Sequence, residues 1–421
     1  MKIAIIGAGN VGTALGESLG AAGHDVMYGV RASRSVPAGA RTAAPRDAAA
    51  GSDVVVLATP WSAAEAVVRD LGDLGGRVLV DAINPIAAGF KLALGHTTSG
   101  AEALQALAPS ARVVKGFNTV GFEVMRAPRF AHGAAAMFLA GDDAGATATA
   151  AALATDLGFD AVPLAGLARA RELEPLAMLW IGLSRSGPWG RDFAFGVRRR
   201  VGPVTPVTTK AAQARDIVVY GAGHIGGALA RAWLRAGHRV RVATRDTSAE
   251  AVRALVVAGA VAVAPEGGAS GADVVALAVP AAAAADVAAR AGTIEGKLVI
   301  DCTNAVAKGM VLEHGLATSA AEQLAARLPG AHVVKAFNQQ GAEVLVAPLF
   351  DGLPAVGFVA GDDATARASA VALVEDVGLR PVDAGPLAAA RLLEPLTLLW
   401  LAASRALATR ELGFVLLERR R

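Results

Sequence analysis

A repeat of more than 200 residues is the feature that most constrains the fold of this chain. The hexapeptide GAGNVG at 7–12 returns as GAGHIG at 221–226, an offset of 214 residues. From residue 53 onward, matching segments recur at an offset of 220, such as KGFN at 115–118 and KAFN at 335–338. This period far exceeds the 20–50 residues of solenoid repeats. The chain is therefore predicted to contain two copies of one complete domain.

The order of apolar runs within one copy predicts its fold class. Residues 201–214, VGPVTPVTTKAAQA, read as a linker, which places the first domain at 1–200 and the second at 215–421. Strand-like and helix-like segments alternate along the first copy. Strands are expected at 2–6, 25–30, 54–58, 78–80, 113–114 and 134–140, and helices at 11–22, 62–71, 101–108, 143–157 and 168–186. This alternation is typical of an α/β fold with a doubly wound, parallel Rossmann-type sheet, here closed by an apolar C-terminal helix.

The glycine hexapeptide predicts a dinucleotide site. It follows an expected strand and opens an expected helix in both copies. Gly7 permits the tight turn, Gly9 lets the backbone approach a pyrophosphate, and Gly12 lets helix and strand pack closely. The helix N-terminus adds free N–H groups and a positive dipole end. A glycine turn without a ligand is the alternative, and the context in both copies favours the binding site.

The end of the second strand indicates which dinucleotide binds. NAD-binding domains usually place a carboxylate there for the ribose hydroxyls. The first copy instead has Arg31, Ser33 and Arg34, whose guanidinium and hydroxyl groups suit a 2′-phosphate. The second copy keeps Arg245 and Thr247, with Asp246 between them. NADP(H) is therefore expected in the first copy and less firmly in the second.

Composition limits the other possible classes. The net charge is only +3, so the chain carries no nucleic-acid footprint, and the clusters Arg198–Arg200 and Arg419–Arg421 are interpreted as solvated ends of terminal helices. With a single cysteine, Cys302, no internal disulfide can form. No apolar run reaches the ~18 residues of a membrane helix. A cytoplasmic protein with small-molecule partners, no membrane and no nucleic acid is expected.

Several polar residues resemble functional-site residues, but their positions in the sequence favour a structural interpretation. His24 and His238 follow a glycine at an expected helix end, and Asp142–Asp143 fit a helix N-cap better than a metal motif. Lys115 is interpreted either as a phosphate contact or as a lysine at a surface strand end. We find no catalytic triad, no metal-spaced Cys/His cluster and no P-loop, so neither a catalytic side chain nor a metal site is predicted.

Motifs beyond the glycine loop carry a family resemblance. They are ATPW at 58–61, DAINP at 81–85, KGFNT at 115–119 and ARELEPL at 170–176. With GAGNVG they resemble the deazaflavin (coenzyme F420)-dependent NADP oxidoreductases, and the same domain type resembles the NADPH-binding domain of transmembrane metalloreductases. The resemblance covers most of both copies. It implies hydride transfer between NADP(H) and 8-hydroxy-5-deazaflavin, with a flavin as another possible partner.

The resemblance also implies roles for individual residues. Gly9, Asn10, Val11 and Gly12 would hold the pyrophosphate, while Thr59 and Pro60 would border it and the ribose. Asn84, Asn118 and Thr119 would lie near the nicotinamide and the deazaflavin. The equivalent loop of the second copy comprises Gly221, Gly223, His224, Ile225 and Gly226.

The second copy departs from these motifs. Trp61 is replaced by Ala281, Pro85 by Ala305 and Thr119 by Gln339, so this copy is expected to bind a dinucleotide less reliably and to lack turnover. Two alternatives to the oxidoreductase remain: an imine or ketone reductase, and an NADPH-binding sensor or scaffold. The apolar segments 173–183 and 393–403 are expected to pair the two copies as an internal pseudo-dimer.

Overall fold

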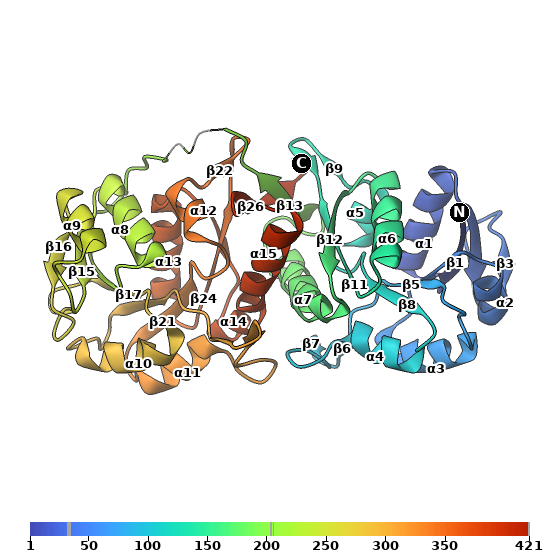
Figure 1. The fold of residues 1–421 in the computed structure, drawn as a ribbon, viewed down its shortest axis with the longest axis horizontal. Coiled ribbons are helices and arrows are strands. Elements are labelled where there is room, and N and C mark those ends of the chain that lie inside the picture. The colour runs from blue at the N-terminus through green and yellow to red at the C-terminus, as the bar shows by residue number, and fades with distance from the viewer. Residues whose placement is uncertain (32–34, 203, 205, 420–421) are drawn as a thin grey trace. The chain divides into compact units, whose positions relative to one another are not determined.

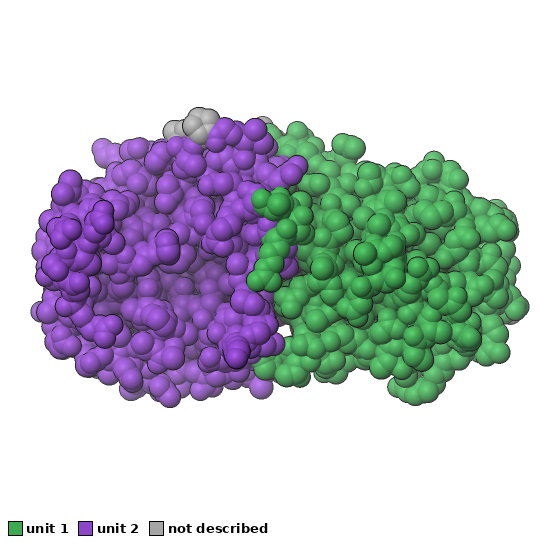
Figure 2. Space-filling model, in the orientation of Figure 1, with its two compact units in different colours: residues 1–197, 405–408, 416–421 green, residues 198–404, 409–415 purple. Residues whose placement is uncertain are grey.

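A computed structural model describes residues 1–31, 35–202, 204 and 206–419. The chain divides into two compact units, shown in Figure 2. Unit 1 comprises residues 1–197, 405–408 and 416–421, and unit 2 comprises 198–404 and 409–415. The last residues of the chain therefore belong to unit 1.

Unit 1 is built on an eight-stranded sheet (Figure 1). Its strand order is β12-β11-β8-β5-β4-β1-β2-β3. The strands are β1 (Lys2–Ile6), β2 (Asp25–Gly29), β3 (Thr42–Ala43), β4 (Val54–Leu57), β5 (Val78–Asp81), β8 (Arg112–Lys115), β11 (Ala136–Gly141) and β12 (Asp160–Ala165). All neighbouring pairs are parallel except β8 and β11. Strand order reverses at β1, so the carboxyl ends of β1 and β4 form the crevice where such sheets bind ligands.

Helices cover both faces of this sheet, which explains why the strands are continuous apolar runs. One core cluster joins Ala4 and Ile6 of β1 to α2 (Pro45–Ala50), α3 (Trp61–Leu71) and α4 (Gly100–Leu107). The other face carries α1 (Asn10–Ala21), α5 (Phe122–Arg126) and α6 (Ala144–Asp156) (Figure 1). The tandem Rossmann-type α/β fold is thereby confirmed, with one antiparallel pair in each sheet.

Unit 2 repeats the same sheet in the order β16-β15-β14-β17-β18-β21-β24-β25. Its strands are β14 (Asp216–Tyr220), β15 (Arg239–Ala243), β16 (Val261–Val263), β17 (Val274–Leu277), β18 (Leu298–Asp301), β21 (His332–Ala336), β24 (Val356–Gly361) and β25 (Arg380–Asp383). Its helices are α8 (His224–Ala236), α9 (Glu250–Val257), α10 (Ala281–Arg290), α11 (Ala320–Arg327), α12 (Ala342–Val346) and α13 (Ala364–Asp376). The six additional residues of this copy lie between β15 and β17, where α9 precedes β16, whereas in unit 1 the short β3 precedes α2.

The end of each copy differs from the expectation. Helix α7 (Ala170–Ser186) is followed by a strand, β13 (Phe193–Arg199), and α15 (Pro395–Ala406) is followed by β26 (Leu412–Glu418). The basic clusters therefore do not end a terminal helix, and that interpretation was wrong. The short continuous apolar runs within FAFGVRR and LGFVLLE were the signal for buried strands.

The arginines of these clusters make defined contacts. Arg200 pairs with Glu411 and stacks 4.6 Å from the Phe350 ring in unit 2. In unit 1, Arg419 pairs with Asp192 at 3.3 Å and lies 4.8 Å from the Phe130 ring. Each arginine is thus packed on an aromatic ring of its own unit.

Proline affects the last long helix differently in the two units. Pro175 lies inside an uninterrupted α7, whereas in unit 2 α14 (Ala390–Leu393) ends before Pro395 begins α15. The segment Leu387–Ala406 is long and apolar enough to cross a membrane by length and composition, although 61% of its apolar window is buried inside the structure. Such burial is typical of a core helix. Arg391 and Glu394 interrupt the apolar sequence of this segment, which is why the sequence predicted no membrane helix here.

Candidate functional site

The glycine loop of unit 1 is a tight turn held against the next strand. Gly7 has a φ of +110°, which a side chain rarely adopts. A Cβ at Gly7 would lie 2.6 Å from the carbonyl oxygen of Ala58, at the end of β4. A Cβ at Gly12 would lie 2.0 Å from the carbonyl oxygen of Gly7. These two glycines are therefore required by internal packing, in agreement with the roles assigned from the sequence.

Gly9 is different because nothing inside the protein requires it to be a glycine. Its φ is −80°, and no atom lies within 4 Å of where its Cβ would stand. Gly9 is the N-cap of α1, no side chain caps this helix, and Asn10 is exposed. The first turn of α1 thus lacks a capping side chain, and the space beside Gly9 is open to an external anion.

A buried hydroxyl without a partner lies beside this loop. Thr59 follows β4, and its Oγ1 is buried with no hydrogen-bond partner in the protein. Its Cγ2 would lie 3.2 Å from a Cβ at Gly7, which places the threonine next to the glycine turn. Pro60, the N-cap of α3, is exposed beside it. A buried polar atom that lacks a partner needs an explanation, and a bound ligand is one.

Two asparagines meet at the ends of the neighbouring strands. Asn84 follows β5 and donates from Nδ2 to the carbonyl oxygen of Asn118 at 2.9 Å. Asn118 follows β8 and donates from Nδ2 to Oδ1 of Asn84 at 3.0 Å and to the carbonyl oxygen of Leu173 at 3.1 Å. The Oδ1 atom of Asn118 is buried and unpartnered, and the adjacent Thr119 is also buried. The structure therefore brings Asn84 and Asn118 together, and Thr119 follows Asn118 directly in the chain.

Unit 2 satisfies or removes both unpartnered atoms. Val279 replaces Thr59, which eliminates the hydroxyl. Gln339 replaces Thr119 and donates from Nε2 to Oδ1 of Asn338 at 2.7 Å, although its own Oε1 is then left without a partner. Thr397 also donates to Oδ1 of Asn304 at 2.8 Å. The acceptor groups that unit 1 leaves available are thus occupied within the protein in unit 2.

The glycine loop of unit 2 nevertheless keeps the geometry of unit 1. Gly221 has a φ of +102°, and a Cβ at Gly226 would lie 1.9 Å from the carbonyl oxygen of Gly221. Gly223 is the N-cap of α8, which His224 and Ile225 open, and nothing lies within 4 Å of a Cβ placed on it. The loop is therefore retained while the strand ends beside it have changed.

The candidate 2′-phosphate residues are only partly described. Arg31 is exposed just after β2, and Ser33 and Arg34 lie outside the described residues. In unit 2, Arg245 and Thr247 are exposed after β15. Asp246 accepts hydrogen bonds from the backbone N and the Oγ of Ser248 at 2.9 and 2.6 Å, which lowers the pKa of its carboxyl.

A buried ion cluster joins the ends of β5 and β8 to the neighbouring helices. Lys115 is fully buried, with its Nζ 2.9 Å from Oδ2 of Asp81 and 3.0 Å from Oε1 of Glu174. Glu174 also accepts from the backbone N of Gly100 at 3.0 Å and of Ala101 at 3.3 Å, at the start of α4. Both readings of Lys115 from the sequence, as a phosphate contact or a surface lysine, were therefore wrong.

Burial and charge act in opposite directions on this cluster. Burial lowers the pKa of Lys115, but the two carboxylates outweigh it and the net shift is upward, so the lysine remains protonated. Burial raises the pKa of Glu174, and Asp81 adds to this. Lys335, Asp301 and Glu394 form the same cluster in unit 2, at 2.9 and 3.3 Å. The cluster is thus a shared structural element that ties β5, β8, α4 and α7 together.

Comparison with known proteins locates both copies in one family. A family model described as "NADP oxidoreductase coenzyme F420-dependent" matches residues 2–85 and 216–305. A solved structure from Arthrobacter sp. FB24, described as a "putative f420 dependent nadp-reductase", is 34% identical over 44% of this chain and 94% of its own, with a TM-score of 0.42. The hypothetical protein SMa0349 from Sinorhizobium meliloti is 31% identical over 42% of this chain and 88% of its own, with a TM-score of 0.38.

The chain belongs to this family of F420-dependent NADP oxidoreductases. Metalloreductase STEAP3 from Rattus norvegicus is 30% identical over 185 residues, which are 42% of this chain and 37% of that protein. The chain thus spans little more than a third of that relative. The family resemblance carried by the motifs is confirmed, as is the class of NADP-dependent oxidoreductase.

Other polar residues have the structural roles expected for them. Asp143 is the N-cap of α6 and accepts from the backbone N of Ala146 at 2.6 Å, while Asp142 accepts from the backbone N of Leu167 at 2.8 Å. His24 lies 3.1 Å from Asp156, and His238 lies 3.0 Å from Asp376. All four are tied to helix ends.

Glu172 is a buried acid that sequence reasoning did not single out. It lies 3.2 Å from Arg169, and its Oε2 is buried without a partner. Burial raises the pKa of its carboxyl to about 7, against the lowering effect of Arg169 and Arg171. Leu392 stands at the equivalent position of unit 2. This difference between the two copies was the signal in the sequence that could have identified Glu172.

Proposed function

We propose that unit 1 binds NADP(H) across the glycine loop and transfers hydride between the nicotinamide and a deazaflavin- or flavin-type acceptor. The observation that carries the proposal is the pair of buried, unpartnered oxygens, Thr59 Oγ1 and Asn118 Oδ1, at the strand ends of unit 1. Leaving such groups unpaired costs about 1–3 kcal/mol each, so a ligand that pairs with them gains that free energy on binding.

Each part of the site has a distinct task in this proposal. The first-turn N–H groups of α1 hold the pyrophosphate, and Arg31, Ser33 and Arg34 hold the 2′-phosphate. Thr59 and Pro60 border the ribose. The Oδ1 atom of Asn118 accepts a hydrogen bond from a group such as a carboxamide N–H, and Asn84 fixes the orientation of Asn118.

The chemistry needs little acid–base assistance from the protein. Once bound, the nicotinamide and the acceptor supply hydride donation and acceptance between them. The residues of unit 1 orient the two rings and exclude water. The direction of transfer depends on which partner is supplied reduced.

The proposal is tested by titrating the full chain with NADPH and with NADH, and binding is monitored by fluorescence. In Arg31→Ala, loss of one or two charge-assisted bonds of ~1.5–3 kcal/mol each should weaken NADPH binding at least tenfold and leave NADH binding nearly unchanged. Arg245→Ala is the matched control in unit 2 and should change the main binding phase less than threefold. Absence of nucleotide binding to the intact chain would contradict the proposal.

The acceptor is tested separately by mixing the NADPH-loaded protein with coenzyme F420 or FMN and following NADPH absorbance. Oxidation by F420 faster than by FMN would support the deazaflavin. Equal rates with no dependence on Asn118→Ala would contradict an acceptor site at the asparagine pair. Unit 2 is proposed to retain at most weak dinucleotide binding, because it lacks the hydroxyl of Thr59 and pairs the asparagine acceptor, Oδ1 of Asn338, with Gln339.

Two further expectations remain proposals. The apolar segments 173–183 and 393–403 would pair the two copies as a pseudo-dimer, which predicts that residues 1–200 alone self-associate at micromolar concentration. A cytoplasmic location fits an NADP(H)-dependent enzyme and is tested by fractionation.

A further inference from the structure

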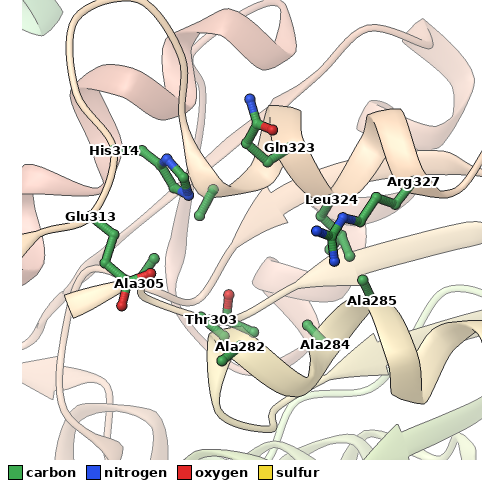
Figure 3. A pocket seen from close by; sticks show the side chains of 12 residues that line it. Ala282, Ala284, Ala285, Thr303, Ala305, Glu313, His314, Gln323, Leu324 and Arg327 are labelled. Atoms are coloured by element: carbon green, nitrogen blue, oxygen red, sulfur yellow. The ribbon is translucent and has the colours of Figure 1, made fainter. Parts of the chain in front are cut away.

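Unit 2 contains a cavity that corresponds to a filled region of unit 1. The cavity has a volume of 240 Å³, far more than the roughly 10–15 Å³ that one water needs. It lies between α10, α11 and the segment after β20 (Val311–Leu312) (Figure 3). It does not involve the glycine loop of unit 2.

Loss of one aromatic side chain explains why the cavity exists. In unit 1, a Cβ at Gly100 would lie 3.3 Å both from Cγ of Pro85 and from Cζ3 of Trp61, so these three residues pack against one another. Their equivalents in unit 2, at the offset of 220, all line the cavity. These equivalents are Ala281 for Trp61, Ala305 for Pro85 and Ala320 for Gly100.

The remaining wall has changed from apolar to polar at the same time. Four residues that are alanine or leucine in unit 1 have become charged or hydrogen-bonding in unit 2. The replacements are Ala93 by Glu313, Leu94 by His314, Ala103 by Gln323 and Leu107 by Arg327. Every one of these four new polar side chains lines the cavity. Glu313, Gln323 and Arg327 are exposed and His314 is half-buried, so these side chains meet solvent as well as the cavity.

The charges are separated across the cavity. Figure 3 shows Glu313 and His314 on one side and Arg327 on the other, beside Leu324 and Ala285. Within the part of the chain that the structure describes, neither Glu313 nor Arg327 has an ion-pair partner. Ala281, Ala284 and Ala285 supply apolar parts of the lining.

From this arrangement we infer that unit 2 binds a small zwitterion with a carboxylate at one end, an amine at the other and a short methylene chain between them. The carboxylate pairs with the Arg327 guanidinium, which suits it in geometry and charge. The ammonium pairs with Glu313. The methylenes cover the alanine surface, and Thr303 and Gln323 supply neutral hydrogen bonds. Unit 2 thereby becomes a ligand-binding counterpart to the dinucleotide-binding unit 1.

The test is calorimetric titration of the full chain with 4-aminobutanoate and 6-aminohexanoate, with adipate and 1,6-diaminohexane as matched probes. Saturable binding of an amino acid, at least tenfold tighter than either probe, is expected. Each test variant installs the residue of unit 1. Arg327→Leu and Glu313→Ala should each weaken binding at least tenfold, and Ala281→Trp should abolish it by refilling the cavity.

Other outcomes would overturn the inference. They are no binding of either amino acid, equal binding of adipate, or unchanged binding in Ala281→Trp with native thermal unfolding. If Ala281→Trp fails to fold, the two exposed variants, Arg327→Leu and Glu313→Ala, decide the question. The NADPH titration with Arg31→Ala tests unit 1 and does not involve the residues of this cavity. Failure of either proposal therefore leaves the other standing.

Discussion

Asn84 and Asn118 hold each other by two hydrogen bonds, from Nδ2 of Asn118 to Oδ1 of Asn84 at 3.0 Å and from Nδ2 of Asn84 to the carbonyl oxygen of Asn118 at 2.9 Å. The pair joins the ends of β5 and β8, which lie side by side in the sheet. All donors of Asn118 face the protein, so only its acceptor, Oδ1, is left for another molecule. Unit 2 repeats the pair but fills that acceptor with Gln339.

Removing the unpartnered hydroxyl of Thr59 is expected to lower NADPH affinity without lowering the free energy of unfolding. Thr59→Val installs the residue of unit 2 and removes a buried polar atom, so the free energy of unfolding without nucleotide should be unchanged or rise by up to about 1 kcal/mol. NADPH affinity should fall about three- to tenfold, as measured by fluorescence titration. The matched variant Val279→Thr should leave NADPH affinity unchanged. A Thr59→Val protein with wild-type affinity would remove Thr59 from the proposed site.

The two glycines of the loop should respond to alanine in opposite ways. Gly9→Ala meets no atom within 4 Å and keeps an ordinary φ, so we expect a change in unfolding free energy of no more than about 1 kcal/mol. NADPH affinity should nevertheless fall at least tenfold, because the new methyl group stands where the pyrophosphate approaches.

Gly12→Ala is the control for this prediction. Its Cβ would lie 2.0 Å from the carbonyl oxygen of Gly7, so the variant should lose stability as well as binding, as followed by thermal unfolding. If Gly9→Ala binds NADPH normally, the loop does not hold a pyrophosphate.

Removing the buried lysine should destabilise unit 1 strongly. Lys115→Met leaves Asp81 and Glu174 as buried carboxylates without a cation, which we expect to cost about 3–5 kcal/mol of unfolding free energy. Urea unfolding should show the transition of unit 1 at lower denaturant concentration. Lys335→Met should shift the transition of unit 2 in the same way. A loss below 1 kcal/mol in both variants would mean that the carboxyls protonate without strain.

The raised pKa of Glu172 gives stability a defined pH dependence. Its carboxyl titrates near 4.5 when unfolded and at about 7 when folded, so the folded state binds more protons between these values. Stability therefore falls as the pH rises through this window. At pH 8, Glu172→Leu should stabilise unit 1 by up to about 3 kcal/mol, and at pH 4 the gain should vanish.

The reciprocal variant is the control for this dependence. Leu392→Glu should destabilise unit 2 at pH 8 and have a smaller effect at pH 4. Thermal unfolding of both variants at the two pH values measures the difference. A stabilisation by Glu172→Leu that is equal at pH 4 and pH 8 would show that packing, and not ionisation, is responsible.

Local patterns along the chain were enough to determine the repeat, the fold class and the glycine loop. These features depend on short-range rules: apolar runs form buried strands, and a glycine turn joins strand to helix whatever surrounds it. The terminal strands β13 and β26 were missed because each short apolar run was interpreted as part of the helical segment before it.

Only the folded chain decided which polar groups have partners. Lys115 and Asp81 are 34 residues apart, yet they lie 2.9 Å apart in a fully buried pair. The contact of Trp61 with Pro85 and Gly100 likewise joins an α3 residue to positions beyond β5, and only this contact shows that Ala281 and Ala305 open a cavity. Such pairings depend on which strand ends the sheet brings together, and sequence spacing does not specify that neighbourhood.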